Sequence, residues 1–442
     1  MTKAQTNPLS EDFHTFSLIR FAFPSMAMML FMGVYTITDT IFAARFIDTN
    51  ALSAINIVCP VLNLIVGMGT MLAAGGSAVV ARKMGSKRAG EARSNFTLII
   101  LTGALLGLAV SLIGFVFLEE IIRGLGASEL LLPYCRDYLR IQLFFAAGNI
   151  MQVLYQNLFV TAGKPGLGLV LSVFAGIANI VFDYIFIVLL QMGIRGASLG
   201  TSIGYMIPTL AGTIFFFTGK SDLHFCRPKM DLAVLGKSCS NGASEMVSQL
   251  SSAVTTFLFN GAMMGLMKED GVAAITVIIY SQFLLTTLFI GFSMGTAPVI
   301  SYNYGSQNEK RLKKVVRICF CFIGAVSLLV FLFSLFAGRH IAGIFSGTNT
   351  HVYELAKDGF SIFSFSFLFS GCNIFASALF TALSNGKVSA AISFFRTFGL
   401  ITVFLLVLPR FLGVAGVWAA IPAAEMGTFV LTGCMVCRYR KH

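Results

Sequence analysis

The chain has 442 residues, of which 56% are hydrophobic and only 11% are charged. Soluble domains carry about 25% charged residues, so this composition excludes a water-soluble fold and makes lipid the solvent for most of the chain. The formal net charge is +12, but the basic residues gather in short clusters between long apolar runs, which is typical of membrane proteins and not of nucleic-acid-binding surfaces.

The amino-terminal segment shows no secretory signal. Its first residues lack a basic region that leads straight into a short apolar stretch and a small-residue cleavage site. The first apolar run, from Phe16 to about Phe42, is longer than the apolar part of a signal peptide. We therefore expect this run to stay in the protein as its first membrane span.

Twelve runs are long and apolar enough to cross a bilayer, which takes about 20 residues of helix. In chain order they are residues 16–42, 52–80, 95–118, 132–161, 167–190, 196–218, 233–262, 272–300, 316–337, 353–383, 388–409 and 415–436. The expected fold is an all-α polytopic membrane protein with twelve transmembrane helices.

The distribution of Lys and Arg predicts the orientation. Loops on the side of the two termini carry most of the basic residues, including clusters at 82–93 and 310–317, whereas the opposite loops mix fewer bases with acids. By the positive-inside rule, both termini are cytoplasmic.

The second half of the sequence repeats the first at a fixed offset. Matching pairs include Ala54 and Ala274, Gly75 and Gly295, Gly85 and Gly305, and Gly193 and Gly413. The repeat predicts two six-helix bundles, residues 1–219 and 233–442, joined by a basic cytoplasmic linker at 220–232. Because six is even, the halves are parallel, related by an axis along the membrane normal. Such halves can alternate between inward- and outward-facing states; the alternative is a duplicated structural bundle without alternating access.

Four acidic residues lie well inside apolar runs, namely Asp39, Asp183, Glu245 and Glu425. A charge at the centre of a membrane helix costs at least about 2.5–3.5 kcal/mol, so such residues are functional candidates. With a helical rise of about 1.5 Å per residue, Asp39 and Asp183 both reach the outer half of the membrane.

A polar cluster is expected around these two acids. Asn179 lies one helical turn before Asp183, and Thr201 reaches a similar depth in the sixth span. Their mates at the repeat offset are apolar or glycine: Phe259, Gly399, Val403 and Ile421. A polar set confined to one half favours a coupling-cation site over a network of hydrogen bonds between helices. Neighbouring carboxyl groups would titrate as a coupled pair and carry H⁺, or the oxygens could coordinate Na⁺; the sequence leaves both open.

The second half offers a different acid. Glu245 lies with Ser248 and Gln249 in the seventh span, where a carboxylate facing a cleft would attract a cationic substrate; a structural hydrogen bond is the alternative. For Glu425 we expect a structural role. The residues expected to line the substrate cleft are Glu245, Ser248, Gln249, Asn373 and Tyr35, and Pro24 is expected to kink the first helix.

No enzyme site or cofactor is expected. All five histidines fall in loops or tails, and Cys434 and Cys437 form a Cys-x-x-Cys pair without a second pair or a nearby His. The turn at Gly163–Pro165 lacks the spacing of a phosphate-binding loop. We expect no metal beyond a candidate Na⁺ at Asp39 and Asp183, and no nucleic-acid partner.

Several motifs together resemble a known transporter family. They are Asp39-Thr-Ile-Phe-Ala, Gly75-Gly-Ser-Ala, Gly85-Ser, Thr161-Ala-Gly-Lys-Pro165, Asn179-x-x-x-Asp183 and Gly413-Val-Ala-Gly-Val-Trp418. Over its whole length the chain resembles the MATE (multidrug and toxic-compound extrusion) family, and within it the DinF-like branch with its staphylococcal-type multidrug exporters.

The resemblance implies a V-shaped pair of six-helix bundles in a bacterial inner membrane. It implies a monomeric antiporter that exports organic cations in exchange for H⁺ or Na⁺, with Asp39, Asn179, Asp183 and Thr201 as the cation site. The sequence departs from the NorM-like branch in the tenth helix, which has no buried Asp and carries only Asn373 with Ser370 and Cys372, so a second cation site is not expected. The alternative function is a lipid-linked oligosaccharide flippase of the same broad superfamily.

Overall fold

The computed structural model describes residues 8–219, 221–346 and 351–439, and all regular structure within them is helical. The first half comprises η1 (Pro8–Ser10), α1 (Thr15–Phe46), α2 (Thr49–Gly85), α3 (Ala89–Val116), α4 (Leu118–Gly124), α5 (Leu132–Phe144), α6 (Ala146–Thr161), α7 (Pro165–Asp183), η2 (Tyr184–Leu189) and α8 (Ile194–Phe217). The second comprises α9 (Leu232–Gly305), α10 (Glu309–Ser346), α11 (His351–Phe363), η3 (Ser364–Ser366), α12 (Phe367–Ala382), α13 (Gly386–Phe394), η4 (Phe395–Gly399), α14 (Leu400–Leu412) and α15 (Val414–Tyr439).

The twelve predicted spans are confirmed. Ten helical stretches of the described chain are long and apolar enough to cross a membrane. Helices α5 and α6 form one more span, bent by 53°. The 74-residue α9 counts as two spans, because its backbone leaves the helical region at Lys268, with φ 53° and ψ −139°. Lys268, Glu269 and Asp270 make this turn polar, as expected for a connection outside the hydrocarbon core.

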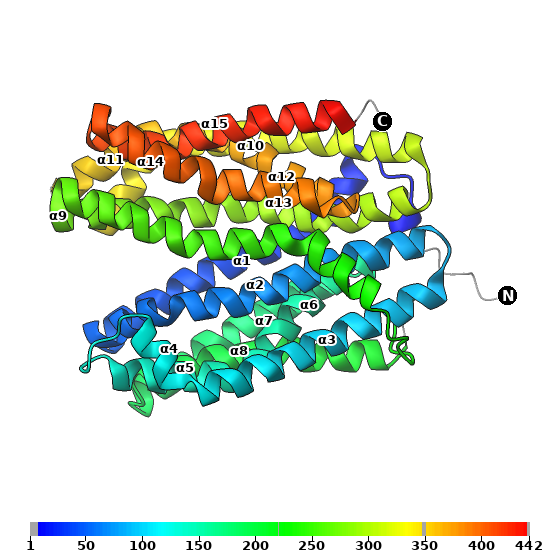
Figure 1. Cartoon of the computed structure of the whole chain (residues 1–442), viewed down its shortest axis with the longest axis horizontal. Helices are drawn as coiled ribbons and strands as arrows, with labels where there is room; N and C mark the ends of the chain where they lie inside the picture. Colours follow the sequence, from blue (N-terminus) through cyan, green and yellow to red (C-terminus); the bar gives the residue numbers. More distant parts are fainter. Residues whose placement is uncertain (1–7, 220, 347–350, 440–442) are drawn as a thin grey trace.

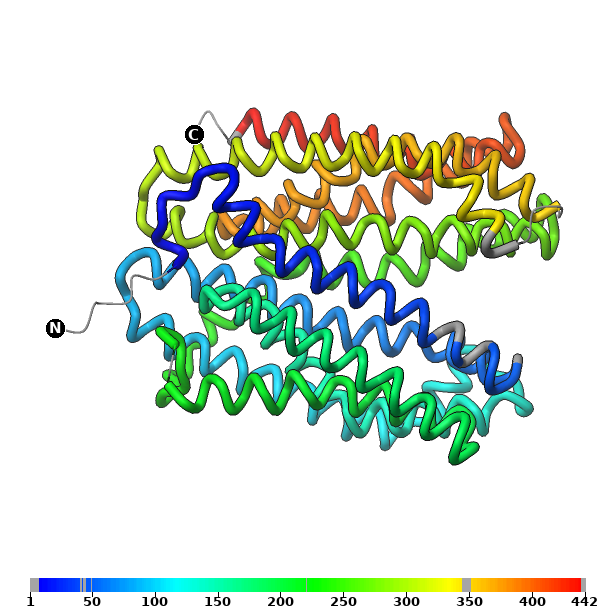
Figure 2. Tube along the Cα trace, turned by 180° about the vertical axis from the view of Figure 1, so that it is seen from behind, coloured from blue at the N-terminus to red at the C-terminus, as the bar shows by residue number. Residues whose placement is uncertain are grey.

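The helices form two groups that draw apart toward one end, a V-shaped pair (Figure 1). One group holds α2–α8 and the other α9–α15, and the first and last described residues lie toward the end where the groups are closest. Helix α1 runs obliquely between them (Figure 2) and packs against both α7 and α9. The domain boundaries at residues 219 and 233 stay predictions, and Lys220, the first residue of the predicted linker, lies outside the described residues.

Each group has its own hydrophobic core. One core is built from residues of 51–223 and includes the fully buried Tyr155 and Phe159, and the other is built mainly from residues of 259–424 and includes Phe289 and Phe292. The segment before α1 joins the second core, since Leu9 and Phe13 are buried there. The described segment before α1 is thus anchored on the second half, although α1 itself belongs to the first repeat.

The connection between the halves lies along α3. Arg93 Nε donates to the carbonyl of Asp222 at 2.9 Å, the Cys226 amide donates to Thr97 Oγ1 at 3.1 Å, and the Lys229 amide donates to Ser94 Oγ at 2.9 Å. These bonds hold residues 222–229 against the first half as far as the start of α9.

Glycines allow the two groups to meet backbone to backbone near the chain ends. A Cβ on Gly85 would lie 2.9 Å from the carbonyl carbon of Tyr302, and one on Gly305 would lie 2.8 Å from that of Arg82. Gly85 and Gly305 are mates at the repeat offset, and so are Arg82 and Tyr302. The contact is therefore symmetric about the axis that relates the repeats. Gly75 approaches Ser238 of α9 in the same way.

Candidate functional site

The polar cluster of the first half is built by α1, α7 and α8. Helix α7 begins at Pro165, and because the first amides of a helix have no partner within it, the missing N–H of proline costs no hydrogen bond there. It carries Asn179 and Asp183 on one face and passes directly into the π-helical η2 after Asp183. Such π segments are uncommon and often occur at functional sites. Helix α8 starts after Gly193, whose φ of 57° suits glycine, and returns Thr201 to the level of Asp183.

The two acids meet at the centre of this cluster. The carboxyl groups of Asp39 and Asp183 lie within hydrogen-bonding reach of one another. The Thr201 hydroxyl lies 3.5 Å from Asp39 Oδ2, at the limit of a hydrogen bond, and also donates to the Ala197 carbonyl at 3.0 Å. The structure thus brings together Asp39, Asp183 and Thr201, which the sequence placed at one depth.

Asn179 completes the cluster without being bonded into it. Its side chain is 2% exposed, and neither its Oδ1 nor its Nδ2 has a hydrogen-bond partner among the described residues. Asp183 is 1% exposed, and its Oδ1 is also unpartnered within the described chain. Buried polar atoms are nearly always paired. The two neighbouring carboxyl groups can share a proton. The unpartnered amide and carboxylate oxygens can instead coordinate Na⁺. The residues therefore fit either coupling ion.

Gly200 makes room for this arrangement. A Cβ at this position would lie 3.1 Å from Asp183 Cγ, closer still to Oδ1, and 3.2 Å from the Asp183 amide nitrogen. Gly204, one turn later, faces the Cβ of Asn179 at 3.5 Å. We did not predict these glycines as site residues. The spacing Gly196-x-x-x-Gly200-x-x-x-Gly204 is the signal that could have found them, because small residues four apart mark a close helix crossing in membranes.

Three tyrosines lie within electrostatic range of Asp39. Tyr35 lies one turn before it on α1, Tyr138 comes from α5 and Tyr205 from α8. Only Tyr35 was predicted, as a cleft residue. It packs beside Phe31 and within 3.3 Å of a Cβ built on Gly176 of α7, next to the cation cluster, and its cleft role stays a prediction.

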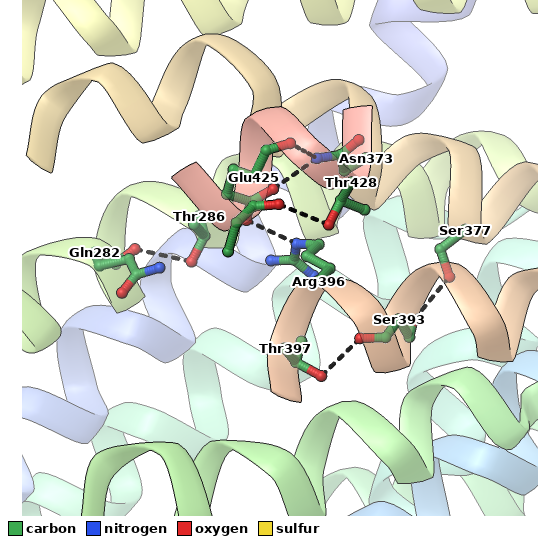
Figure 3. A network of polar contacts seen from close by, with 10 residues as sticks. Gln282, Thr286, Asn373, Ser377, Ser393, Arg396, Thr397, Glu425 and Thr428 are labelled. Atoms are coloured by element: carbon green, nitrogen blue, oxygen red, sulfur yellow. Dashed lines mark hydrogen bonds and ion pairs between the residues drawn. The ribbon is translucent and has the colours of Figure 1, made fainter. Parts of the chain in front are cut away.

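The second half has a buried ion pair in place of a carboxyl pair (Figure 3). Arg396 Nε lies 3.0 Å from Glu425 Oε1, and the two side chains are 15% and 3% exposed. Asn373 donates through Nδ2 to Glu425 Oε2 at 2.7 Å and to the Glu425 carbonyl at 2.9 Å. Arg396 lies in η4, a second π-helical segment. Glu425 is thus neutralised and held by two helices.

The residues predicted to line the cleft have different surroundings in the structure. Asn373 is tied to Glu425, although its Oδ1 has no partner among the described residues. Ser248 donates to the carbonyl of Ser244 on its own helix, and Gln249 packs against Gly67 of α2. Glu245 is half-buried and lies within electrostatic range of Arg396, but it makes no hydrogen bond or ion pair within the described chain. A cleft role for these residues stays a prediction.

Pro24 lies inside α1, which is helical from Thr15 to Phe46 without a break. The kink predicted there stays a prediction. Its neighbour Ser25 is buried, and the serine hydroxyl has no partner among the described residues.

Comparison with known proteins gives the same fold and repeat. The family model MatE matches residues 24–185 and again residues 246–407, two segments of equal length, one in each half. The "Multidrug export protein MepA" of Staphylococcus aureus is 24% identical over 422 residues, which cover 93% of this chain and 91% of the relative. The protein of the same name from Staphylococcus haemolyticus is 24% identical over 417 residues, covering 94% and 91%.

Solved structures agree over the whole length. A MATE in the straight conformation superposes with a TM-score of 0.92 at 20% identity, covering 100% of both chains. An outward-facing multidrug resistance MATE family transporter of the MOP superfamily gives 0.90 at 20% identity, covering 99% and 98%. The Vibrio cholerae MATE transporter VcmN gives 0.90 at 18% identity, covering 99% of each chain. The repeated family match covers most of the chain, and this protein therefore belongs to the MatE family of membrane transporters.

Proposed function

We propose that this protein is a cation-coupled antiporter that exports organic, mainly cationic, drugs and toxic compounds by alternating access. The observation that carries the proposal is the contact between the Asp39 and Asp183 carboxyl groups in one half only. The name of the staphylococcal relatives, multidrug export protein, supports the class of substrate.

Coupling would occur at this carboxyl pair. A hydrogen bond between two carboxyl groups needs a proton on one of them, because an ionised carboxylate only accepts. Proton uptake from outside and release to the inside would make and break the bond between α1 and α7, and so change how α1 packs between the two groups. Na⁺ bound by the carboxylates and Asn179 would act at the same place; the closeness of the two acids, which a shared proton would stabilise, favours H⁺.

The V shape supports an outward-facing state. The groups meet near the termini through Gly85 and Gly305 and draw apart at the other end. With the termini in the cytoplasm of a bacterial cell, as the loop charges predict, the protein is closed to the inside. The halves 1–219 and 233–442 would rock about this contact, joined by 220–232, in a monomer surrounded by lipid.

Cationic substrates would be drawn to Glu245, the half-buried acid without a hydrogen bond in the described chain. A lipid-linked oligosaccharide flippase would instead need a free positive charge inside the membrane, in the cleft between the two halves, for the lipid phosphates. Arg396 is committed to Glu425, which favours the exporter.

The test is efflux of a fluorescent organic cation from proteoliposomes with an imposed ion gradient. Asp39→Asn and Asp183→Asn are expected to abolish gradient-driven efflux. Asp270→Asn is the matched control, because Asp270 is exposed and, among the described residues, its one ion pair is with His351 at the start of α11. Wild-type efflux by both site variants would show that the carboxyl pair does not couple transport.

A further inference from the structure

A basic cavity lies where the start of the chain meets α10. It has a volume of about 390 Å³ and is lined by His14, Thr15, Lys310, Lys313, Lys314, Arg317 and Ile318. Five of these seven side chains are basic or, for His14, able to become so. The cavity shares no lining residue with the carboxyl cluster or the Arg396 network, and neither the proposed transport nor the family match gives it a role.

The cavity continues along α10 as an apolar groove. A second cavity of about 400 Å³ shares Thr15, Arg317 and Ile318 with the first and adds Cys321 and Phe322. These residues recur at helical spacing on one face of α10, which spans the membrane from Glu309 onward. The rise from Lys313 to Phe322 is roughly 14 Å along the helix axis. The lining therefore changes from charged to apolar in the direction of the hydrocarbon core.

Two of these basic side chains have no acidic partner among the described residues. Lys314 pairs with Asp12 at 3.0 Å, and Lys313 pairs with Glu309 at 2.9 Å. Lys310 and Arg317 are exposed and make no ion pair within the described part of the chain. Arg311, beside the cavity, is already used, since it donates to the Ser10 carbonyl at 3.0 Å. Two free cations at the mouth of an apolar groove select a ligand with an anionic head and an apolar tail.

We propose that these joined cavities bind an anionic phospholipid of the surrounding leaflet. Lys310 and Arg317 hold its phosphate, and one acyl chain lies against Ile318, Cys321 and Phe322. Basic pockets at the membrane surface on the cytoplasmic side are suited to such headgroups. The lipid would join the start of α1 to α10, two elements on opposite halves of the repeat (Figure 2). The proposal does not depend on the transported substrate.

The test uses the purified full-length protein in neutral detergent, titrated with phosphatidylglycerol, phosphatidylcholine or inorganic phosphate. Lipid adducts are counted by native mass spectrometry, and the thermal midpoint reports stabilisation. Phosphatidylglycerol should bind and raise the midpoint, and phosphatidylcholine and phosphate should not match it. Lys310→Gln with Arg317→Gln should weaken phosphatidylglycerol binding roughly 30-fold, from the usual effect of two basic residues at a membrane surface.

Two further variants separate the pocket from general charge. Lys87→Gln with Arg227→Gln removes two exposed cations outside the cavity and should leave binding within about twofold of wild type. Cys321→Trp fills the apolar groove and should weaken lipid binding while leaving the basic mouth intact. The proposal would be overturned if the Lys87 and Arg227 control lost as much phosphatidylglycerol binding as the Lys310 and Arg317 variant. It would also be overturned if phosphatidylcholine bound equally well, or if Cys321→Trp left lipid binding unchanged. Inorganic phosphate that binds as well as the lipid would overturn it too, and would assign the site to a soluble anion instead.

Discussion

The symmetric glycine contact predicts how the balance between conformations can be shifted. Gly85 of α2 and Gly305 of α9 each face a backbone carbonyl of the other helix. Gly85→Ala adds a methyl group to a contact with no side chain that could move aside. The two helices must separate locally, and because the contact lies near the chain ends, the separation opens the protein on that side.

The structure gives the magnitude. The new methyl carbon would lie 2.9 Å from the Tyr302 carbonyl carbon, whereas non-bonded carbons rest about 3.5–4.0 Å apart. A shift of roughly 1 Å is therefore needed, and overpacking of this kind costs about 1–3 kcal/mol. If only the closed state contains the contact, the open state gains a factor of about 5 to 150. Gly305→Ala should have the same effect, because its contact with Arg82 is the symmetric one.

Hydrogen–deuterium exchange of the purified protein measures this shift. Peptides that cover the ends of α2 and α9 should exchange faster in both variants than in wild type. Gly90→Ala is the matched control, because a Cβ there meets nothing within 4 Å. Unchanged exchange in Gly85→Ala and Gly305→Ala, with normal thermal stability, would refute the idea that this contact closes the protein.

Three further predictions concern other sites. Gly200→Ala should displace the adjacent carboxyl group and lower gradient-driven efflux at least about tenfold with the fold retained, since overpacking costs about 1–3 kcal/mol. Glu425→Gln should lower the free energy of unfolding by about 3–5 kcal/mol by leaving Arg396 unpaired, and adding Arg396→Gln should restore much of it. The hydrogen bond from Lys314 lowers the pKa of Asp12 below its usual 3.8, so this pair stabilises the fold at neutral pH, and its contribution is lost as the pH falls through the lowered value.

The measurements for these three are efflux from proteoliposomes, denaturant unfolding and a carbon-detected NMR titration of Asp12. Gly236→Ala is the control for Gly200→Ala, since a Cβ at Gly236 meets nothing within 4 Å. Full efflux by Gly200→Ala would contradict the contact with Asp183. Additive losses in the Arg396 and Glu425 double variant would contradict their ion pair. An Asp12 titration unaffected by Lys314→Gln would contradict the pair of Asp12 and Lys314.

Much of the fold follows from the sequence, because the bilayer imposes one requirement on every span. Length and apolar content predict twelve helices, and the polar stretch at Lys268–Asp270 predicts the turn inside α9. Depth along a helix also follows from the position of a residue, because the rise per residue is constant. For this reason Asp39, Asp183 and Thr201 could be placed together before the structure.

Contacts between helices could not be predicted in the same way, because they depend on which faces meet. Tyr138 and Gly200 come from helices whose orientation about their axes the sequence leaves open. Arg396 and Glu425 lie on different helices, and Arg396 lies in the π-helical turn η4, where the spacing of an α-helix does not predict which way a side chain faces. The hydrogen bond from Asn373 to Glu425 joins two helices, and the sequence alone does not predict such a pairing.

The most direct test of the account is ion-driven efflux in proteoliposomes with a pH gradient and no Na⁺, and then with a Na⁺ gradient at equal pH. Wild-type protein should export the organic cation under at least one gradient, with the pH gradient expected to be effective. The Asp39→Asn and Asp183→Asn variants should not respond to that gradient. Efflux that is unaffected by both gradients, or gradient-driven efflux that survives loss of both carboxyl groups, would contradict cation coupling at Asp39 and Asp183.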